Sequence, residues 1–164
     1  MKRKILFYSY IILQSILIVS AIVLFMLSME RNLDFSCKGN NTYQKNINGE
    51  NINITTSISV NFFSDKKIHT IVHGIIRNNQ GAYTINREYD YSYRALDTKK
   101  GRYILTLNSI VKSTNDNDKD NVVSNFLFGG ETTDINIKIN KISNNVLIIG
   151  NVFSPIFSCT VTKN

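Results

Sequence analysis

Apolar and polar residues alternate with a period of two along much of this chain. In the segment INITTSISVNFF, isoleucine, valine and phenylalanine side chains alternate with asparagine, serine and threonine. The segment YTINREYDYSYR continues the same rhythm with tyrosines. Successive side chains of a β-strand point to opposite faces, so this pattern predicts strands with one buried face.

Turn-forming residues separate the alternating segments. Asn, Asp, Gly and Lys cluster at residues 65–67, 78–81, 97–101 and 143–145, and such clusters end strands and reverse the chain. The predicted strands cover residues 52–62, 68–77, 82–94, 102–112, 132–142, 146–153 and 157–161, with a further short strand around 42–47. Seven to eight antiparallel strands joined by short turns predict a mainly β domain that forms a barrel or a sandwich.

Residues 115–131 interrupt the period-two pattern. An Asp-rich start, apolar residues at three-to-four spacing and a Gly-Gly end predict one short helix packed against the sheet. Asp116, Asp118 and Asp120 also match the first ligand positions of a calcium loop. The glycine and glutamate that such a loop needs at its sixth and twelfth positions are absent, so a solvated helix-capping loop is the better interpretation.

The N-terminus has a different pattern, an uncharged apolar run over residues 5–29 that follows Lys2, Arg3 and Lys4. As a helix this run would reach about 37 Å, enough to cross a hydrocarbon core of about 30 Å. A cleaved export signal is the alternative, but its apolar region is usually about 7 to 15 residues long. We therefore predict a transmembrane helix that is retained as an anchor.

Basic residues beside a membrane span stay on the cytoplasmic side, which predicts the topology. Residues 1–4 form a cytoplasmic tail, 5–29 the transmembrane anchor and 30–164 a single domain outside the cytoplasm. A tail of this size cannot hold a DNA-binding or catalytic domain. Any influence inside the cell therefore requires a partner that crosses the same membrane.

Small or hydrogen-bonding residues recur along the predicted span. Gln14, Ala21 and Ser28 fall seven residues apart and so share nearly one helix face. Residues of these types let membrane helices pack closely. They are our candidates for helix packing within the membrane.

The net charge gives little support to nucleic-acid binding. The chain carries a formal charge of +7 with a pI of about 9.4, but three of its basic residues belong to the N-terminal tail. The remaining basic residues are scattered among Asn and acidic residues and form no stripe. The composition therefore fits a mildly basic soluble surface.

The two cysteines, Cys37 and Cys159, lie near the two ends of the predicted outer domain. Outside the cytoplasm two cysteines in one small domain usually pair. We expect an intrachain disulfide that brings the ends of the domain together. Two free buried thiols and an intermolecular bridge remain the alternatives.

No motif indicates an enzyme, a cofactor or a metal site. His69 and His73 lie on a predicted strand, where four residues span about 13 Å, too far for one metal ion. Neither neighbours a nucleophile motif, and a glycine-rich phosphate loop is absent. The pair could instead sense mildly acidic pH, because unperturbed histidine titrates near 6.5; two ordinary surface histidines are the alternative.

One strand face is rich in tyrosine and contains an arginine. Tyr83, Arg87, Tyr89, Tyr91 and Tyr93 share this face. Tyrosines offer a large apolar area with a polar tip, suited to contact with a partner or a ligand, and plain barrel core is the alternative. An arginine that points into a core needs an acidic or anionic partner.

The features above resemble those of the FidL-like inner-membrane proteins. The resemblance rests on the short basic tail, the single span, LDFSCKGN around the first cysteine, ING at 47–49, YTINREYDYSY and the cysteine near the C-terminus. In layout the chain resembles the accessory proteins PsaF and MyfF, and more distantly ToxS and VtrC. The resemblance implies a single-pass protein of the bacterial inner membrane with a periplasmic, lipocalin-like barrel.

The resemblance also implies a partner. ToxR-like regulators combine a cytoplasmic DNA-binding domain, one span and a periplasmic domain, and their small partners bind and protect the periplasmic domain. We therefore expect an accessory protein that promotes virulence or fimbrial gene expression as a heterodimer with such a regulator, in response to acid, temperature or a small amphipath. A free-standing lipocalin-like module for an apolar ligand and an envelope or fimbrial assembly factor are the alternatives.

Overall fold

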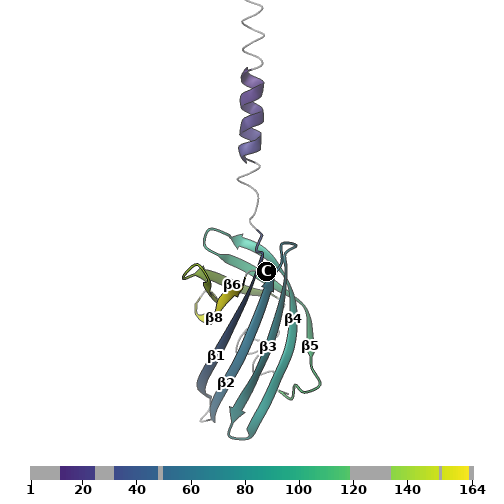
Figure 1. Ribbon diagram of the computed structural model, residues 1–164, viewed down its shortest axis with the longest axis vertical. Coiled ribbons are helices and arrows are strands. Elements are labelled where there is room, and N and C mark those ends of the chain that lie inside the picture. Colours follow the sequence, from purple (N-terminus) through teal and green to yellow (C-terminus); the bar gives the residue numbers. More distant parts are fainter. Residues whose placement is uncertain (1–11, 25–31, 48–49, 119–133, 152, 163–164) are drawn as a thin grey trace, which may run out of the picture. The chain divides into compact units, whose positions relative to one another are not determined.

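The computed structural model describes residues 12–24, 32–47, 50–118, 134–151 and 153–162 (Figure 1). The chain divides into two compact units, Met1–Arg31 and Asn32–Asn164. The first unit contains a helix over residues 12–24. Among the described residues, no helix has the length and apolar character needed to cross a membrane. The two ends of the predicted span, at residues 5 and 29, lie outside the described residues.

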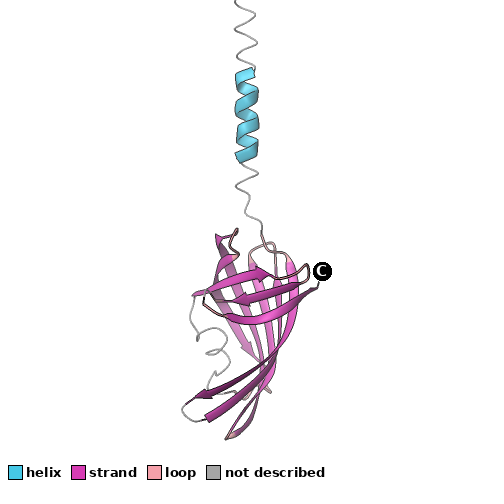
Figure 2. Cartoon of the chain, turned by 90° about the vertical axis from the view of Figure 1, so that its left-hand side faces the viewer, coloured by secondary structure: helices cyan, strands magenta, loops and turns pink. Residues whose placement is uncertain are grey.

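The second unit is a closed barrel of eight antiparallel strands (Figures 1 and 2). Each strand pairs with the next along the chain, and β8 pairs with β1 to close the circle. This confirms the predicted mainly β fold and decides between barrel and sandwich. The strands are β1 (Phe35–Ile47), β2 (Glu50–Phe62), β3 (Lys67–Asn78), β4 (Gly81–Asp97), β5 (Arg102–Lys112), β6 (Asp134–Lys141), β7 (Val146–Gly150) and β8 (Pro155–Thr162).

The first strand is longer than the sequence pattern predicts. We expected a short strand near residues 42–47, but β1 begins at Phe35 and has 13 residues. All of them pair with β2, from Phe35 opposite Phe62 onward. The prediction failed because β1 places Gly39 and Asn41 on its inward face, where the alternation of apolar residues is interrupted.

The barrel is complete only over part of its length. The strands β1 to β4 have 12 to 17 residues, whereas β7 has 5. The strand β8 pairs with β1 only at Ser36–Lys38, and β6 pairs with β5 only over Arg102–Thr106. Figure 2 shows the long strands continuing past the short ones. We call the part with all eight strands the closed end and the remainder of the long strands the extended half.

Aromatic rings fill the closed end. The ring centroids of Phe35 and Phe62 lie 4.6 Å apart, and those of Tyr93 and Tyr103 lie 5.9 Å apart in an edge-to-face arrangement. Tyr93 also meets the edge of Phe62 at 6.4 Å. Such ring pairs contribute roughly 0.5–1.5 kcal/mol each beyond their buried area.

The disulfide between Cys37 and Cys159 is present, which confirms the intrachain prediction. Their Cα atoms are 5.5 Å apart, both residues are buried, and 122 positions of sequence separate them. The bond joins β1 to β8, the two strands whose pairing closes the barrel. A Cβ atom at the neighbouring Gly39 would lie 2.0 Å from the carbonyl oxygen of Ser158, so only glycine lets these strands approach so closely.

Candidate binding surfaces of the barrel

Arg87 on β4 points into the barrel and is bound by two carboxylates. Its side chain is fully buried. Its Nε donates to Asp116 Oδ2 at 2.7 Å, and one terminal nitrogen donates to Asp116 Oδ1 and to Asp118 Oδ2, each at 3.0 Å. The same nitrogen donates to the backbone oxygen of Asp118 at 2.7 Å. The structure thus supplies the acidic partners that a buried arginine requires.

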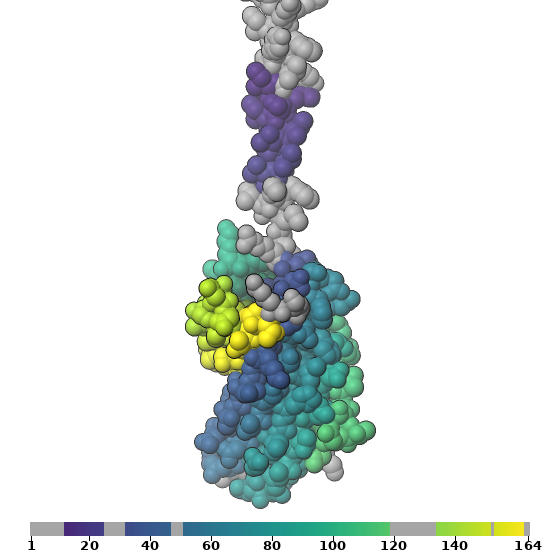
Figure 3. All heavy atoms as spheres, in the orientation of Figure 1, coloured from purple at the N-terminus to yellow at the C-terminus, as the bar shows by residue number. Residues whose placement is uncertain are grey.

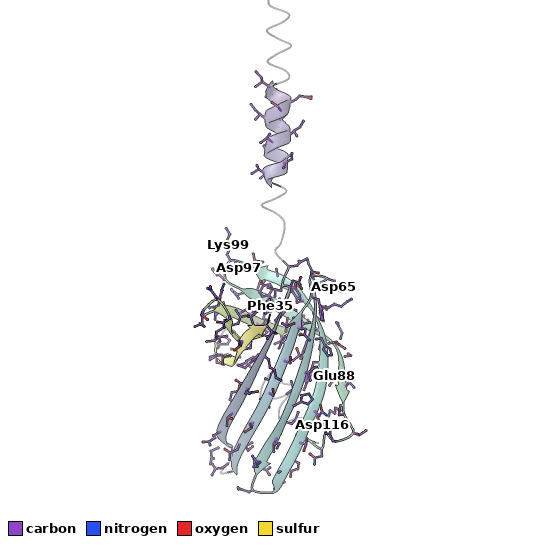
Figure 4. All side chains as sticks on the ribbon, viewed as in Figure 1. Phe35, Asp65, Glu88, Asp97, Lys99 and Asp116 are labelled. Carbon is purple, nitrogen blue, oxygen red and sulfur yellow. A yellow bond between two sulfur atoms is a disulfide. The ribbon has the colours of Figure 1, made fainter. Side chains whose placement is uncertain are left out.

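The segment that provides these carboxylates continues from β5 along the edge of β4. The backbone nitrogen of Asn117 donates to Thr84 O at 3.1 Å, and that of Asn86 donates to Asp116 Oδ2 at 3.0 Å. Figure 4 places Asp116 toward the end of the barrel opposite Phe35. The described part of this segment, up to Asp118, is not helical, and the rest of the predicted helix lies outside the described residues.

The contacts of Asp116 and Asp118 with Arg87 argue against a calcium loop at this segment. Asp116 and Asp118, two of its three proposed ligands, are held by a guanidinium group, and Asp120 lies outside the described residues. No cluster of three or more His, Cys, Asp or Glu residues in the described part could hold a metal ion.

The pKa values of this group follow from burial and pairing. Burial raises the pKa of Asp116, but the hydrogen bonds from Arg87 and Asn86 reverse that effect and hold the pKa below its ordinary value. Burial lowers the pKa of Arg87, and the carboxylate partners more than compensate and raise it. Both groups are therefore charged at neutral pH, and the pair acts as an internal tie between β4 and the segment after β5.

The predicted tyrosine contacts lie inside the barrel. Tyr89, Tyr91 and Tyr93 are 1%, 2% and 6% exposed, and Tyr83 is half-buried. Burial raises the pKa of Tyr91 and of Tyr93. These rings are barrel core, so together with Arg87 they offer no contact to a partner on the outer surface. The alternation alone could not reveal this, because either face of a strand can be the buried one.

The histidines lie on the outer face of β3. His69 Nδ1 is 2.7 Å from Asp90 Oδ1, and its Nε2 is 3.8 Å from Glu88 Oε2. Ser109 Oγ donates to the other oxygen of Asp90 at 2.8 Å. His69 and Ser109 thus both bind the carboxylate of Asp90. In a catalytic triad the histidine would instead lie between the serine and the carboxylate. The hydrogen bonds from His69 and Ser109 lower the pKa of Asp90; His73 is exposed.

In the part of the extended half that the structure describes, two buried polar side-chain atoms have no hydrogen-bond partner. They are Asn41 Nδ2 and Thr56 Oγ1, which belong to residues directly opposite each other on β1 and β2. Thr56 is 2% exposed. An unsatisfied buried polar group costs roughly 1–3 kcal/mol. Sequence analysis missed both, since isolated Asn and Thr residues are common in strands.

A hollow of about 600 Å³ is lined mainly by outward-facing residues of β1 to β4. Figure 3 shows this side of the barrel toward the viewer. Its lining combines two aliphatic residues, exposed Ile75 and buried Ile85, with the basic side chains of His73 and Arg77 and with amides and hydroxyls. Ile75 is 38% exposed. The polar lining includes Asn40, Thr55, Ser57, Thr84, Asn86 and Asn115.

The residues predicted to pack helices in the membrane belong to the first unit. Gln14 and Ala21 lie on the described helix, and both are exposed. Ser28 lies outside the described residues. Their role in packing stays a prediction.

Comparison with known proteins identifies the family. A family model described as "FidL-like putative membrane protein" matches residues 74–159, more than half of the chain. The chain belongs to this family. The matched part of this FidL-like protein runs from β3 into β8 and includes Arg87, both of its carboxylate partners and Cys159. No curated protein matches the chain, and the more distant likeness to ToxS and VtrC stays a prediction.

Proposed function

We propose that this FidL-like protein is a membrane-anchored accessory protein that binds the periplasmic domain of a ToxR-like membrane transcription regulator. The basic residues Lys2, Arg3 and Lys4 followed by the apolar run 5–29 support an anchor in the bacterial inner membrane with the barrel in the periplasm. The family assignment to membrane proteins agrees with this anchor.

The filled closed end of the barrel is the observation that favours a protein partner. Phe35, Phe62, Tyr93 and Tyr103 pack against one another where a lipocalin-like barrel would hold a ligand. A protein partner would then bind the outer surface, where the faces of β1 to β4 present polar groups around a hollow. Protein partners bind to such extended outer surfaces.

The mechanism we propose is linkage. A partner that binds only the folded periplasmic domain of the regulator stabilises that domain by mass action and protects it from proteolysis. Formation of the heterodimer would also favour the DNA-binding arrangement of the regulator, and acid, temperature or a small amphipath would shift this equilibrium. Virulence or fimbrial genes would then be transcribed in proportion to the heterodimer.

Co-expression tests the proposal. The full chain and the full-length regulator encoded beside it are extracted in detergent, and the mass of the complex is determined by size exclusion with light scattering. We expect a heterodimer, and a lower abundance of the regulator in cells that lack the FidL-like protein. Separate elution of the two proteins together with unchanged regulator abundance would contradict the proposal.

The unpaired buried atoms of Asn41 and Thr56 favour a second candidate, a module that binds a small molecule within the extended half. A ligand with one acceptor and one donor group would satisfy both atoms. Native mass spectrometry of the full chain should then detect a co-purified small molecule that Thr56→Val releases. An assembly factor would instead crosslink to envelope or fimbrial subunits.

A further inference from the structure

The hollow on the outer face of β1 to β4 has a one-sided charge. Among the described residues that line it, the two ionisable ones, His73 and Arg77, are both basic, and none is acidic. Both side chains are exposed, and no ion pair joins either to a described carboxylate. By contrast, Lys67, His69, Arg87 and Lys100 each have a carboxylate within 4.0 Å. The hollow is therefore complementary to an anionic group.

The dimensions of the hollow favour an extended ligand over a small ion. His73 and Arg77 are four residues apart on β3, which corresponds to about 13 Å along a strand. The lining also crosses from Asn40 on β1 to Thr84 and Asn86 on β4, about 14 Å at the usual strand spacing. A phosphate or a single carboxylate would contact only a small part of this area.

The remaining lining groups suit a polypeptide. Threonine and serine hydroxyls and asparagine amides both donate and accept, as the backbone of an extended peptide requires. Ile75 lies between His73 and Arg77 on β3 and supplies an aliphatic contact at the centre. An acidic residue next to an aliphatic one in the bound segment would meet Arg77 and Ile75 together.

The hollow lies toward the end of the long strands that is opposite the first residues of the barrel unit. The chain enters the barrel at the closed end, where Asn32 Nδ2 donates to Ser64 O at 2.8 Å and the backbone of Leu33 donates to Tyr93 Oη at 2.7 Å. Arg77 and Thr84 flank the turn between β3 and β4. This turn is at the other end of the long strands from the β2–β3 turn that Asn32 contacts.

We propose that this hollow binds an extended acidic segment of a partner protein through Arg77, with His73 and Ile75 completing the contact. The proposal rests on the function proposed above and assigns the partner to one face of the barrel. Because the contact uses charge, it weakens with rising salt concentration.

Photo-crosslinking in intact cells tests this assignment. A photo-reactive phenylalanine analogue replaces Ile75 in the full chain, and a second strain carries the analogue at Ile142, which is 63% exposed and outside the hollow. Irradiation should yield a protein adduct from position 75, and mass spectrometry should map it to a segment with Asp or Glu. Absence of an adduct at position 75, or an adduct mapped to a segment without acidic residues, would overturn the proposal.

Matched charge reversals distinguish a contact in the hollow from an effect of the net charge of the protein. Arg77→Glu and Arg94→Glu change the net charge equally, and Arg94 is exposed on β4 outside the hollow. We expect Arg77→Glu to reduce the adduct roughly tenfold, while Arg94→Glu leaves it nearly unchanged and Arg77→Lys retains most of it. Equal effects of the two reversals would overturn the proposal.

The outcome is distinguishable from a failure of the proposed function. If the co-expressed regulator forms a heterodimer but position 75 yields no adduct, the partner binds elsewhere and only the hollow is excluded. Thermal unfolding of Arg77→Glu and Arg77→Lys guards against misfolding, and both should unfold at the temperature of the unmodified chain. A variant that unfolds earlier is replaced in the comparison by Arg77→Gln, for which the same loss of adduct is expected.

Discussion

The closed end and the extended half of the barrel are stabilised by different means. At the closed end eight strands surround packed aromatic rings, and a disulfide ties β1 to β8. In the extended half, β1 to β5 continue past the short strands, and a buried ion cluster around Arg87 lies in the interior. Packed apolar rings are stable without a counter-charge or a hydrogen-bond partner. Buried charged and polar groups are stable only when such a partner is present. We therefore expect the stability of the extended half to respond more strongly to pH than that of the closed end.

Removal of the disulfide should have the largest effect. Cys37→Ala with Cys159→Ala opens a loop of 122 positions, and the chain-entropy model gives an upper loss of about 5 kcal/mol in the free energy of unfolding. Urea unfolding measures this loss, and hydrogen exchange should accelerate more in β8 than in β3. Equal acceleration of hydrogen exchange in β8 and β3 would contradict a specific role of the disulfide in holding β8 to β1.

Removal of the buried guanidinium should cost nearly as much. Arg87→Met leaves the carboxylates of Asp116 and Asp118 buried without their cation, and we expect a loss of about 3 kcal/mol or more in the free energy of unfolding. Adding Asp116→Asn and Asp118→Asn should recover part of this loss, since the uncompensated charge is then gone. If the Arg87→Met variant is as stable as the unmodified chain, the ion cluster of Arg87 with Asp116 and Asp118 does not stabilise the fold.

Acid should weaken the extended half before the closed end. Because the pKa of Asp116 in the folded protein is below its ordinary value of 3.8, the unfolded chain binds more protons at low pH. The contribution of Asp116 is complete above about pH 4 and is lost as the pH falls through the lower, folded pKa.

The measurement is the free energy of unfolding between pH 2 and 5. Asp116→Asn should flatten its decline with falling pH. The control is Asp90→Asn, because the pKa of Asp90 is also lowered but its side chain is 51% exposed, and solvent weakens such pairs. Equal flattening by both variants would contradict the special role of the buried pair.

The smallest predicted effect concerns the unpaired hydroxyl. Thr56→Val removes a buried hydroxyl that has no hydrogen-bond partner among the described residues. The unliganded protein should therefore gain about 1 kcal/mol in the free energy of unfolding. Thr70→Val serves as the control, because Thr70 is also buried on an inward face and its side chain is not among those left unsatisfied. A loss of stability in Thr56→Val would indicate that the hydroxyl has a bound partner in solution.

The sequence by itself determined the β class, the approximate positions of most strands and their antiparallel order. The alternation in β2 to β5 and the turn residues between them depend on local chain geometry, so strand positions and their order followed from the pattern. The sequence also predicted the pairing of Cys37 with Cys159, and the structure decided against two free thiols and an intermolecular bridge.

Only the tertiary structure decided which side chains are available for binding. Period two shows that Tyr89, Tyr91 and Arg87 share a face but not that this face points inward. The contact of Arg87 with Asp116 and Asp118 joins residues about 30 positions apart, and the hollow gathers side chains from four strands. Such assemblies depend on strand register and closure, which arise from long-range pairing rather than from local preference.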